Sequence, residues 1–206
     1  EDGIRDVAVT GVQTCALPIY RTPAALEAAW KYFILCGVGI AQALLGTVLI
    51  YFASERALGS GEGSLLWTRL HSIAGSLDPS VMSLAFVFLL VGYGTKAGLA
   101  PLHNWLPDAY SEAPTPVAVL SGLLLNVALY SLLRCKILVD AALPTSFTGL
   151  LLLGFGLLSV VIAALFLLRQ RDLNRLLAYS SIEHMGIATF AFGIGGVAAN
   201  FAGCLH

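Results

Sequence analysis

Five apolar stretches, each about as long as a membrane-crossing helix, constrain this chain more than any other feature. A helix rises about 1.5 Å per residue, so about 20 apolar residues cross the ~30 Å hydrocarbon core of a bilayer. We therefore predict an all-α polytopic membrane protein with about five transmembrane helices in contact with the lipid bilayer. The predicted spans are Trp30–Ala53, Val81–Leu106, Thr115–Leu138, Ser146–Leu168 and Leu176–Phe201.

Composition and charge narrow the class further. Of the 206 residues, 58% are hydrophobic and only 11% are charged, which is more apolar surface than a soluble domain of this size can bury. The net charge of −1 gives no reason to expect nucleic acid as a partner. The four cysteines stand far apart with no C-x-x-C pair, so we expect no metal site. We also expect no catalytic residue and no cofactor in this chain.

The first nineteen residues differ in character from the rest of the chain. They have neither the apolar core of a signal peptide nor helical periodicity. The run VTGVQTCALPI, Val9–Ile19, matches the in-frame translation of a common sequencing adapter. We interpret residues 1–19 as adapter-derived and unstructured, and we expect both ends of the sequence to be cut. The alternative is a genuine loop of the protein.

The loops and span ends suggest how the chain sits in the membrane. Three arginines in Arg169–Arg175 predict a cytoplasmic loop by the positive-inside tendency, which places 54–80 on the outer side. Within that outer connection, Leu65–Ile73 is predicted to be a short helix on the interface. Aromatic residues near the ends of the first span, Tyr32 and Tyr51 among them, are predicted interfacial anchors.

Lys96 is the most informative single residue, because it follows an apolar run directly and more apolar residues continue after it. An ammonium at bilayer depth costs roughly 2.5–3.5 kcal/mol on insertion scales. Burial favours the neutral amine, whereas a nearby carboxylate favours the charged form, so a lysine held between these influences can bind and release protons. The alternative is a lysine that snorkels to the interface and handles no proton.

Glycines and prolines surround this lysine. Pro101 lacks the N–H that a continuous helix would donate to Ala97. Freed carbonyls in a membrane must be satisfied by protein or water, so a broken helix at this depth predicts a lined, hydrated cavity. The residues expected to make the break are Gly94, Gly98, Pro101 and Pro107.

Three further groups are predicted to relay protons with Lys96. His103 follows it by seven residues and would share its face if the helix were continuous, but Pro101 lies between them and would interrupt that helix. Glu183 and His184 lie within the fifth span, where histidine can change charge near neutral pH. Being adjacent, these two diverge by about 100° around a helix. For His103 the alternative is a hydrogen-bonded structural role.

Two other polar patterns stand out. Asn126, Tyr130 and Arg134 recur at intervals of four and form a stripe on one face of the third span. We expect the stripe to face the bundle or a watery cleft, or Asn126 to serve in helix–helix hydrogen bonding. Asp172 and Arg175, three residues apart, are predicted to form an interfacial ion pair.

Two segments then suggest a family. GTKAGLAPLHNWLPDAYSEAPTPV and QRDLNRLLAYSSIEHMG resemble the antiporter-like proton-translocating subunits of respiratory complex I, membrane-bound hydrogenases and multisubunit sodium/proton antiporters. Within that family, the GYGTKAGLAPLH and YSSIEHMG forms are most similar to the component F group of hydrogenase-4. The resemblance extends from Tyr20 to His206.

The resemblance implies two inverted five-helix repeats, each with a broken helix near a key lysine, and Lys96 matches the key lysine of the first repeat. Residues 20–144 would be the end of the first repeat, with three spans, and 145–206 the truncated start of the second, with two. The family's partner glutamate would lie before Tyr20 and is absent from this sequence. The family's DIKR lysine position is Asn174 here.

The function that the resemblance implies is proton translocation within a hydrogenase-4-type or NADH-quinone-oxidoreductase-type complex of a bacterial or archaeal cell membrane. The expected partners are other membrane subunits, a peripheral redox arm, and protons or, alternatively, sodium ions. One alternative is a subunit of a multisubunit sodium/proton antiporter without redox chemistry. A second alternative is a structural membrane bundle with no relay.

Overall fold

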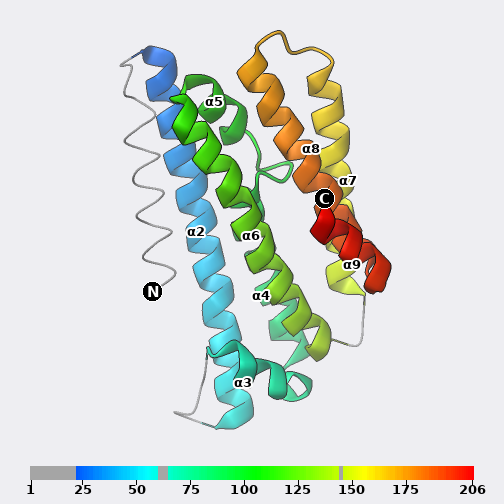
Figure 1. Ribbon diagram of the computed structural model, residues 1–206. Coiled ribbons are helices and arrows are strands. Elements are labelled where there is room, and N and C mark those ends of the chain that lie inside the picture. The colour runs from blue at the N-terminus through cyan, green and yellow to red at the C-terminus, as the bar shows by residue number, and fades with distance from the viewer. Residues whose placement is uncertain (1–21, 60–64, 144–145) are drawn as a thin grey trace.

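A computed structural model describes residues 22–59, 65–143 and 146–206. The adapter-like segment 1–19 lies outside the described residues. Within these ranges the regular secondary structure is entirely helical, with no strand, which confirms an all-α polytopic fold (Figure 1). The elements are α2 Pro23–Leu58, α3 Trp67–Ser72, the 3-10 turn η2 Ala74–Ser76, α4 Pro79–Ala97, α5 Trp105–Glu112, α6 Thr115–Ala142, α7 Phe147–Leu167, α8 Leu173–Ile194 and α9 Gly196–Leu205.

Four helices in the described part of the chain are long and apolar enough to cross a membrane, so the count of five spans is not confirmed. They are α2, α4, α7 and the stretch Ser121–Ala142 of α6. The fifth predicted span is interrupted: α8 ends at Ile194 and α9 begins at Gly196. Gly195 and Gly196 both have positive φ, 73° and 80°, so the chain changes direction where only glycine is unstrained.

Local sequence signals explain where several helices start. Asp78 accepts the N–H of Ser80 ahead of α4, and Asp172 accepts that of Asn174 ahead of α8. Thr22 caps α2 in the same way through Ala25 N–H. These side chains satisfy N–H groups that have no partner inside a helix. Proline follows two of the caps, where its missing N–H costs nothing.

The second span is shorter than the sequence predicts. Helix α4 ends at Ala97, not Leu106, and residues 98–104 turn away before α5 begins. α5 begins at the end of the predicted second span and occupies the connection to the predicted third span, and its aromatic and aliphatic side chains are buried against α2 and α8. Pro107 was expected to break this segment but lies in the first turn of α5, where proline is tolerated. The short helix α3 falls inside the predicted interfacial segment.

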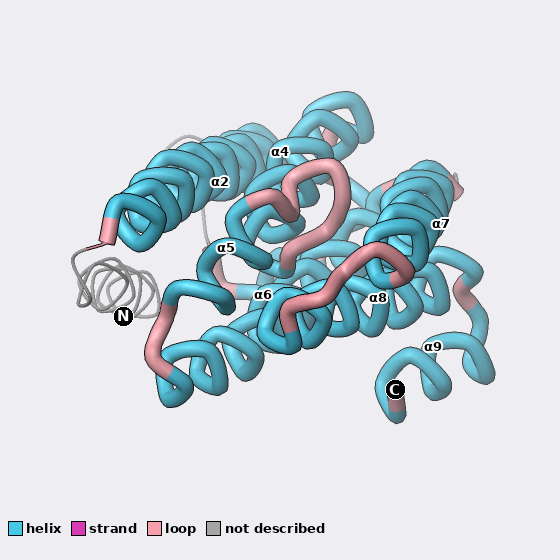
Figure 2. Tube along the Cα trace, turned by 90° about the horizontal axis from the view of Figure 1, so that it is seen from above, coloured by secondary structure: helices cyan, strands magenta, loops and turns pink. Residues whose placement is uncertain are grey.

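Glycines allow two helix pairs to approach at backbone distance. A Cβ on Gly92 of α4 would lie 2.6 Å from the carbonyl of Gly39 in α2, and a Cβ on Gly156 of α7 would lie 2.8 Å from that of Gly186 in α8. In a bilayer the hydrophobic effect does not drive helices together, so close van der Waals packing of this kind stabilises their association. Figure 2 looks along the bundle, with the α2–α4 pair on one side and the α7–α8 pair on the other.

The two pairs meet around α5 and α6. Helix α6 packs mainly on α4 and also contacts α8, while α5 contacts α2 and α8. The start of α2, helix α5 and the α7–α8 connection lie at one end of the bundle, and α3 lies at the other (Figure 1). Outward faces of α2 and α7 carry exposed leucines, valines and phenylalanines, as expected for surfaces that face lipid or further apolar helices.

Candidate functional site

Lys96 lies in the last turn of α4 and is half-buried against α2. Its Nζ donates a hydrogen bond of 2.7 Å to the hydroxyl of Tyr32 and lies 5.0 Å from the centre of that ring. Tyr32 is 1% exposed. The interfacial role predicted for Tyr32 is therefore wrong: it is buried in the α2–α4 contact and binds the lysine. A tyrosine hydroxyl can accept from the ammonium and can donate to the neutral amine.

Helix α4 is interrupted directly after the lysine. Gly98 adopts a left-handed conformation with φ 73°, and the N–H of Leu99 bonds to the carbonyl of Gly94 at 2.9 Å. This is a glycine-capped helix end, in which the turning backbone satisfies the last carbonyls. The predicted break is present, but Gly98 makes it; Gly94 is helical, and Pro101 lies in the turn beyond.

Trp105 braces the interruption from α5. Its indole Nε1 donates a hydrogen bond of 2.8 Å to the carbonyl of Thr95, and the residue is 1% exposed. The ring also packs edge-on against Tyr32, with centroids 5.1 Å apart. One aromatic pair thus holds both the end of α4 and the hydroxyl that contacts Lys96, so the lysine is positioned by rigid groups on two other helices.

His103 lies in the turn between α4 and α5 and is 6% exposed. The broken helix removes it from the face of Lys96 on which a continuous helix would have placed it. Its ring packs edge-on toward Tyr179 of α8, with centroids 6.5 Å apart. Burial lowers the pKa of His103, and its Nδ1 is buried with no hydrogen-bond partner among the described residues. This nitrogen can therefore bind a water molecule, the usual partner of such a group.

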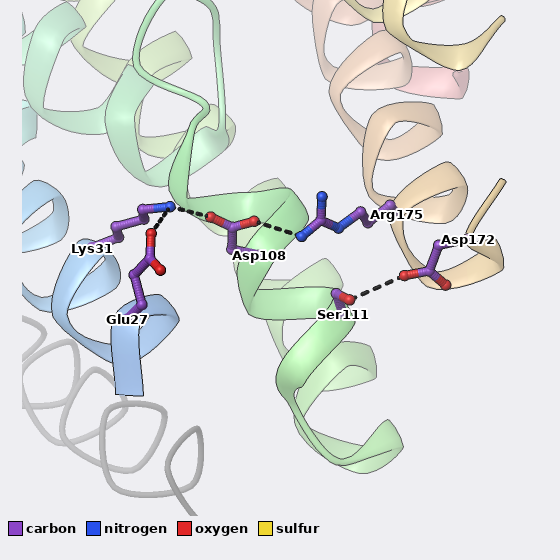
Figure 3. Close-up of polar contacts among 6 residues, drawn as sticks. All are labelled: Glu27, Lys31, Asp108, Ser111, Asp172 and Arg175. Atoms are coloured by element: carbon purple, nitrogen blue, oxygen red, sulfur yellow. Dashed lines mark hydrogen bonds and ion pairs between the residues drawn. The ribbon is translucent and has the colours of Figure 1, made fainter. Parts of the chain in front are cut away.

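Asp108 connects three helices by ion pairs (Figure 3). One carboxylate oxygen accepts from Lys31 of α2 at 2.8 Å, and the other lies 3.2 Å from Arg175 Nη2 of α8. Lys31 also pairs with Glu27 one turn earlier at 2.8 Å. Asp108 thus ties α5 to α2 and α8.

The predicted Asp172–Arg175 ion pair is wrong. Asp172 caps α8 through Asn174 N–H and accepts a 3.0 Å hydrogen bond from Ser111 of α5, while Arg175 turns to Asp108. Helix α5, which the sequence did not predict, brings a better acceptor within reach of the guanidinium. A cavity of about 100 Å³ opens beside this network, lined by Ala24, Glu27, Ala28, Lys31, Asp108, Glu112 and Arg175.

The polar stripe faces outward at Asn126 and Tyr130 and packs on α3 only at Arg134. Asn126 is exposed and Tyr130 is 56% exposed on the outer face of α6. Arg134 bonds the hydroxyl of Tyr130 at 2.8 Å and stacks over the ring of Trp67 at 4.4 Å. The spacing correctly predicts one shared face, but it cannot show which side of α6 the neighbouring helices occupy.

The two ionisable groups of α8 point different ways, as their adjacency requires. Glu183 is half-buried and has no hydrogen-bond or ion-pair partner within the described ranges. His184 is exposed, and its Nδ1 lies 2.9 Å from Nε2 of His206 at the end of α9. Two imidazoles in hydrogen-bond contact can exchange a proton, because each ring nitrogen is a donor or an acceptor according to its tautomer.

Three parts of this arrangement are not evident from the sequence. They are the contact of Tyr32 with the lysine, the connection of Lys31 and Arg175 through Asp108, and the place of His206 beside His184. Each depends on a contact between segments that are distant in sequence, up to 77 residues apart for Lys31 and Asp108. A group of three or more histidine, cysteine or acidic side chains that could hold a metal is absent from the described part of the chain.

The fold and site together define a class: polytopic α-helical membrane proteins with an ionisable lysine beside an interrupted helix. The family model for the transmembrane region of NADH:quinone oxidoreductase and Mrp antiporter proteins matches residues 10–206. The chain belongs to this family.

Individual relatives agree with this assignment. The chain is 60% identical over 189 residues to a hydrogenase-4 component F homologue of Methylacidiphilum infernorum, an alignment that covers 91% of this chain and 40% of the relative. A subunit of the archaeal membrane-bound sulfane sulfur reductase superposes with a TM-score of 0.85 at 31% identity, over 96% of this chain and 39% of that one.

A third comparison extends the likeness to an antiporter. The Mrp complex of Dietzia sp. DQ12-45-1b superposes with a TM-score of 0.81 at 26% identity, covering 96% of this chain and 21% of that chain. The sequence thus spans about two-fifths of the length of its hydrogenase relative and less of the Mrp subunit.

Proposed function

We propose that this chain is part of a proton-translocating membrane subunit of a hydrogenase-4-type or NADH-quinone-oxidoreductase-type complex. The likeness to hydrogenase-4 component F supports this choice of complex. On this proposal, residues 20–144 form the end of the first antiporter-like repeat and residues 145–206 the start of the second. Its partners are other membrane subunits and a peripheral redox arm, in the inner membrane of a bacterium or archaeon.

The observation that carries the proposal is the position of Lys96. A half-buried amine beside an interrupted helix, held by a buried hydroxyl 2.7 Å away, is arranged to change charge rather than to anchor a helix end. Partial burial favours the neutral amine, and the hydrogen bond and the ring face of Tyr32 favour the ammonium. A small change among its neighbours can then load or release the proton.

His103, Glu183 and His184 are the other groups we assign to the relay. The unpartnered Nδ1 of His103 supports a water-mediated contact, and the 2.9 Å contact between His184 and His206 supports transfer along α8 and α9. Redox chemistry in partner subunits would supply the energy, because this chain is assigned no redox centre of its own.

The superposition on an Mrp complex favours one alternative, a subunit of a multisubunit sodium/proton antiporter. The site is chemically compatible with both functions, since either requires a lysine that takes up and releases a proton. The two functions differ in their driving force. Proton movement driven by electron transfer indicates the redox complex, and proton movement driven by an added sodium gradient indicates the antiporter.

The test replaces Lys96 in the full-length subunit, assembled in its complex and sealed in membrane vesicles. Lys96→Met removes the titrating amine, and Lys96→Arg keeps the positive charge but cannot give up its proton. Both variants are expected to abolish proton uptake, measured with a pH-sensitive dye, while the complex still assembles. Unchanged uptake in Lys96→Met would leave only the structural bundle, with Lys96 snorkelling.

A further inference from the structure

Ser159 of α7 makes a hydrogen bond that neither the sequence motifs nor the relay require. Its hydroxyl oxygen accepts the backbone N–H of Ala100 at 2.9 Å, although the two residues are 59 positions apart. Ala100 lies in the turn that follows the interruption of α4, four residues after Lys96. Both residues are fully buried at 0% exposure, so water cannot take over this bond.

The surroundings of Ser159 fix its hydroxyl in place. The hydroxyl donates a hydrogen bond of 2.7 Å to the carbonyl of Phe155 one turn earlier, which leaves the lone pairs of its oxygen to accept from Ala100. On the other side α8 packs directly against it: a Cβ built on Gly186 would lie only 2.9 Å from Ser159 Cβ. The serine side chain cannot retreat from the turn without moving α8.

The bond also joins two parts of the bundle that otherwise touch little. Helix α4 packs mainly on α2 and α6, whereas α7 packs mainly on α8. The N–H of Ala100 is a donor that no helix or strand satisfies, and a buried donor without an acceptor is costly. Ser159 therefore determines where the chain runs as it leaves Lys96.

We propose that Ser159 is a positioning residue for proton translocation, in which its hydroxyl holds the turn after Lys96 against α7 and so couples the lysine to the α7–α8 pair. This inference rests on the proposed relay role of Lys96. The hydroxyl itself carries no proton along the path: it accepts one hydrogen bond and donates another, both to backbone groups.

The test compares variants of the full-length subunit in its complex. Ser159→Ala removes the acceptor without adding volume, and Ser159→Thr keeps a hydroxyl. Thr189→Ala is the matched control, because Thr189 is also 0% exposed in the same helix pair but, among the described residues, its hydroxyl bonds within its own helix, to the Met185 carbonyl at 2.7 Å. Two quantities are measured: protons moved per electron pair, and deuterium uptake of the peptide that contains Ala100.

Ser159→Ala is expected to lower the proton-to-electron ratio roughly five- to tenfold and to raise amide exchange at Ala100 by at least a similar factor. Thr189→Ala should stay close to wild type, and Ser159→Thr, which keeps the hydroxyl but adds a methyl group in the tight α7–α8 contact, should lose less than Ser159→Ala. A Ser159→Ala protein that keeps the wild-type ratio, while Lys96→Met loses it, overturns the positioning role alone. If both Ser159→Ala and Lys96→Met keep the wild-type number of protons moved per electron pair, the proposed function is overturned as well.

The exchange measurement keeps the inference testable if Ser159→Ala does not assemble. In the wild-type complex, the Ala100 amide is expected to exchange as slowly as the buried helical amides around it. Fast exchange there would show that no stable bond to Ser159 exists, and that result would also overturn the inference.

Discussion

The ammonium of Lys96 and the phenol of Tyr32 form a hydrogen bond of 2.7 Å across the α2–α4 contact. Tyr32 belongs to α2, which ends about twenty residues before α4 begins in the sequence, and Trp105 of α5 packs against its ring. This arrangement gives the lysine a fixed polar partner inside an apolar bundle, and it determines which substitutions should matter.

Replacement of Tyr32 by phenylalanine should weaken the proposed proton relay without removing it. The ring remains, and with it the packing on Trp105 and the ring face beneath Lys96, but the hydroxyl is lost. A neutral hydrogen bond contributes about 0.5–1.5 kcal/mol, so we expect proton translocation to fall by about two- to tenfold. The measurement is dye-monitored proton uptake in vesicles, with Tyr51→Phe as control. Equal losses in both variants would argue against a specific role of the Tyr32 hydroxyl.

Asp108→Asn should destabilise the protein, because it leaves Lys31 and Arg175 facing each other without the carboxylate between them. The site is partly exposed, so the expected loss is about 1–2 kcal/mol, between the values for surface and buried ion pairs. Thermal unfolding of the full-length subunit in detergent measures it. Glu112→Gln is the control, since Glu112 lines the same cavity without an ion pair in the described residues. Similar unfolding temperatures for the two variants would contradict the three-helix role of Asp108.

The α7–α8 contact should tolerate no added methyl group at Gly156. A Cβ there would meet the Phe190 backbone nitrogen at 2.6 Å, so Gly156→Ala should destabilise the protein by about 1–3 kcal/mol despite the better helix propensity of alanine. Gly154→Ala, two residues earlier on the same helix, meets nothing within 4 Å and should be neutral or slightly stabilising. Thermal unfolding separates the two, and a reversed order would mean that α7 and α8 are not packed as described.

The stability of the protein should fall in mild acid because of His103. Burial lowers the pKa of this imidazole in the folded state, so the unfolded chain binds a proton at a higher pH than the folded one does. The stabilising contribution of neutral His103 is complete above the pKa of histidine in the unfolded chain, about 6.5. This contribution is lost as the pH falls toward the lower pKa of His103 in the folded state. A His103→Gln variant cannot titrate and should lose less stability between about pH 7.5 and about pH 5. Parallel pH profiles of unfolding would contradict this role.

Apolar length predicts most of the helices, because a membrane requires long, internally hydrogen-bonded segments. The beginnings of α4 and α6 fall within a few residues of the predicted spans, since Pro79 and Pro114–Pro116 mark them. The end of α4 is harder to predict, because Pro101 is the stronger helix breaker, whereas Gly98, three residues earlier, reverses the chain. Helix α5 escapes prediction because it is short and begins within a proline-containing stretch that is typical of a loop.

Contacts between distant helices cannot be derived from periodicity. The spacing of Asn126, Tyr130 and Arg134 predicts a common face but not the side on which that face lies. Likewise, the i,i+3 spacing of Asp172 and Arg175 predicts a pair only while no better partner is known, and Asp108 is the better partner. Lys96 can be identified from sequence because an ionisable group in an apolar segment is conspicuous without any knowledge of the fold.

The most direct test of the central claim is the number of protons moved per electron pair by sealed vesicles that carry the full-length subunit in its complex, with and without Lys96→Met. If Lys96 carries the proton, the variant complex should assemble and still transfer electrons, and its ratio should fall to near zero. A Lys96→Met complex that matches the wild-type ratio would contradict the proton-carrying role of this lysine.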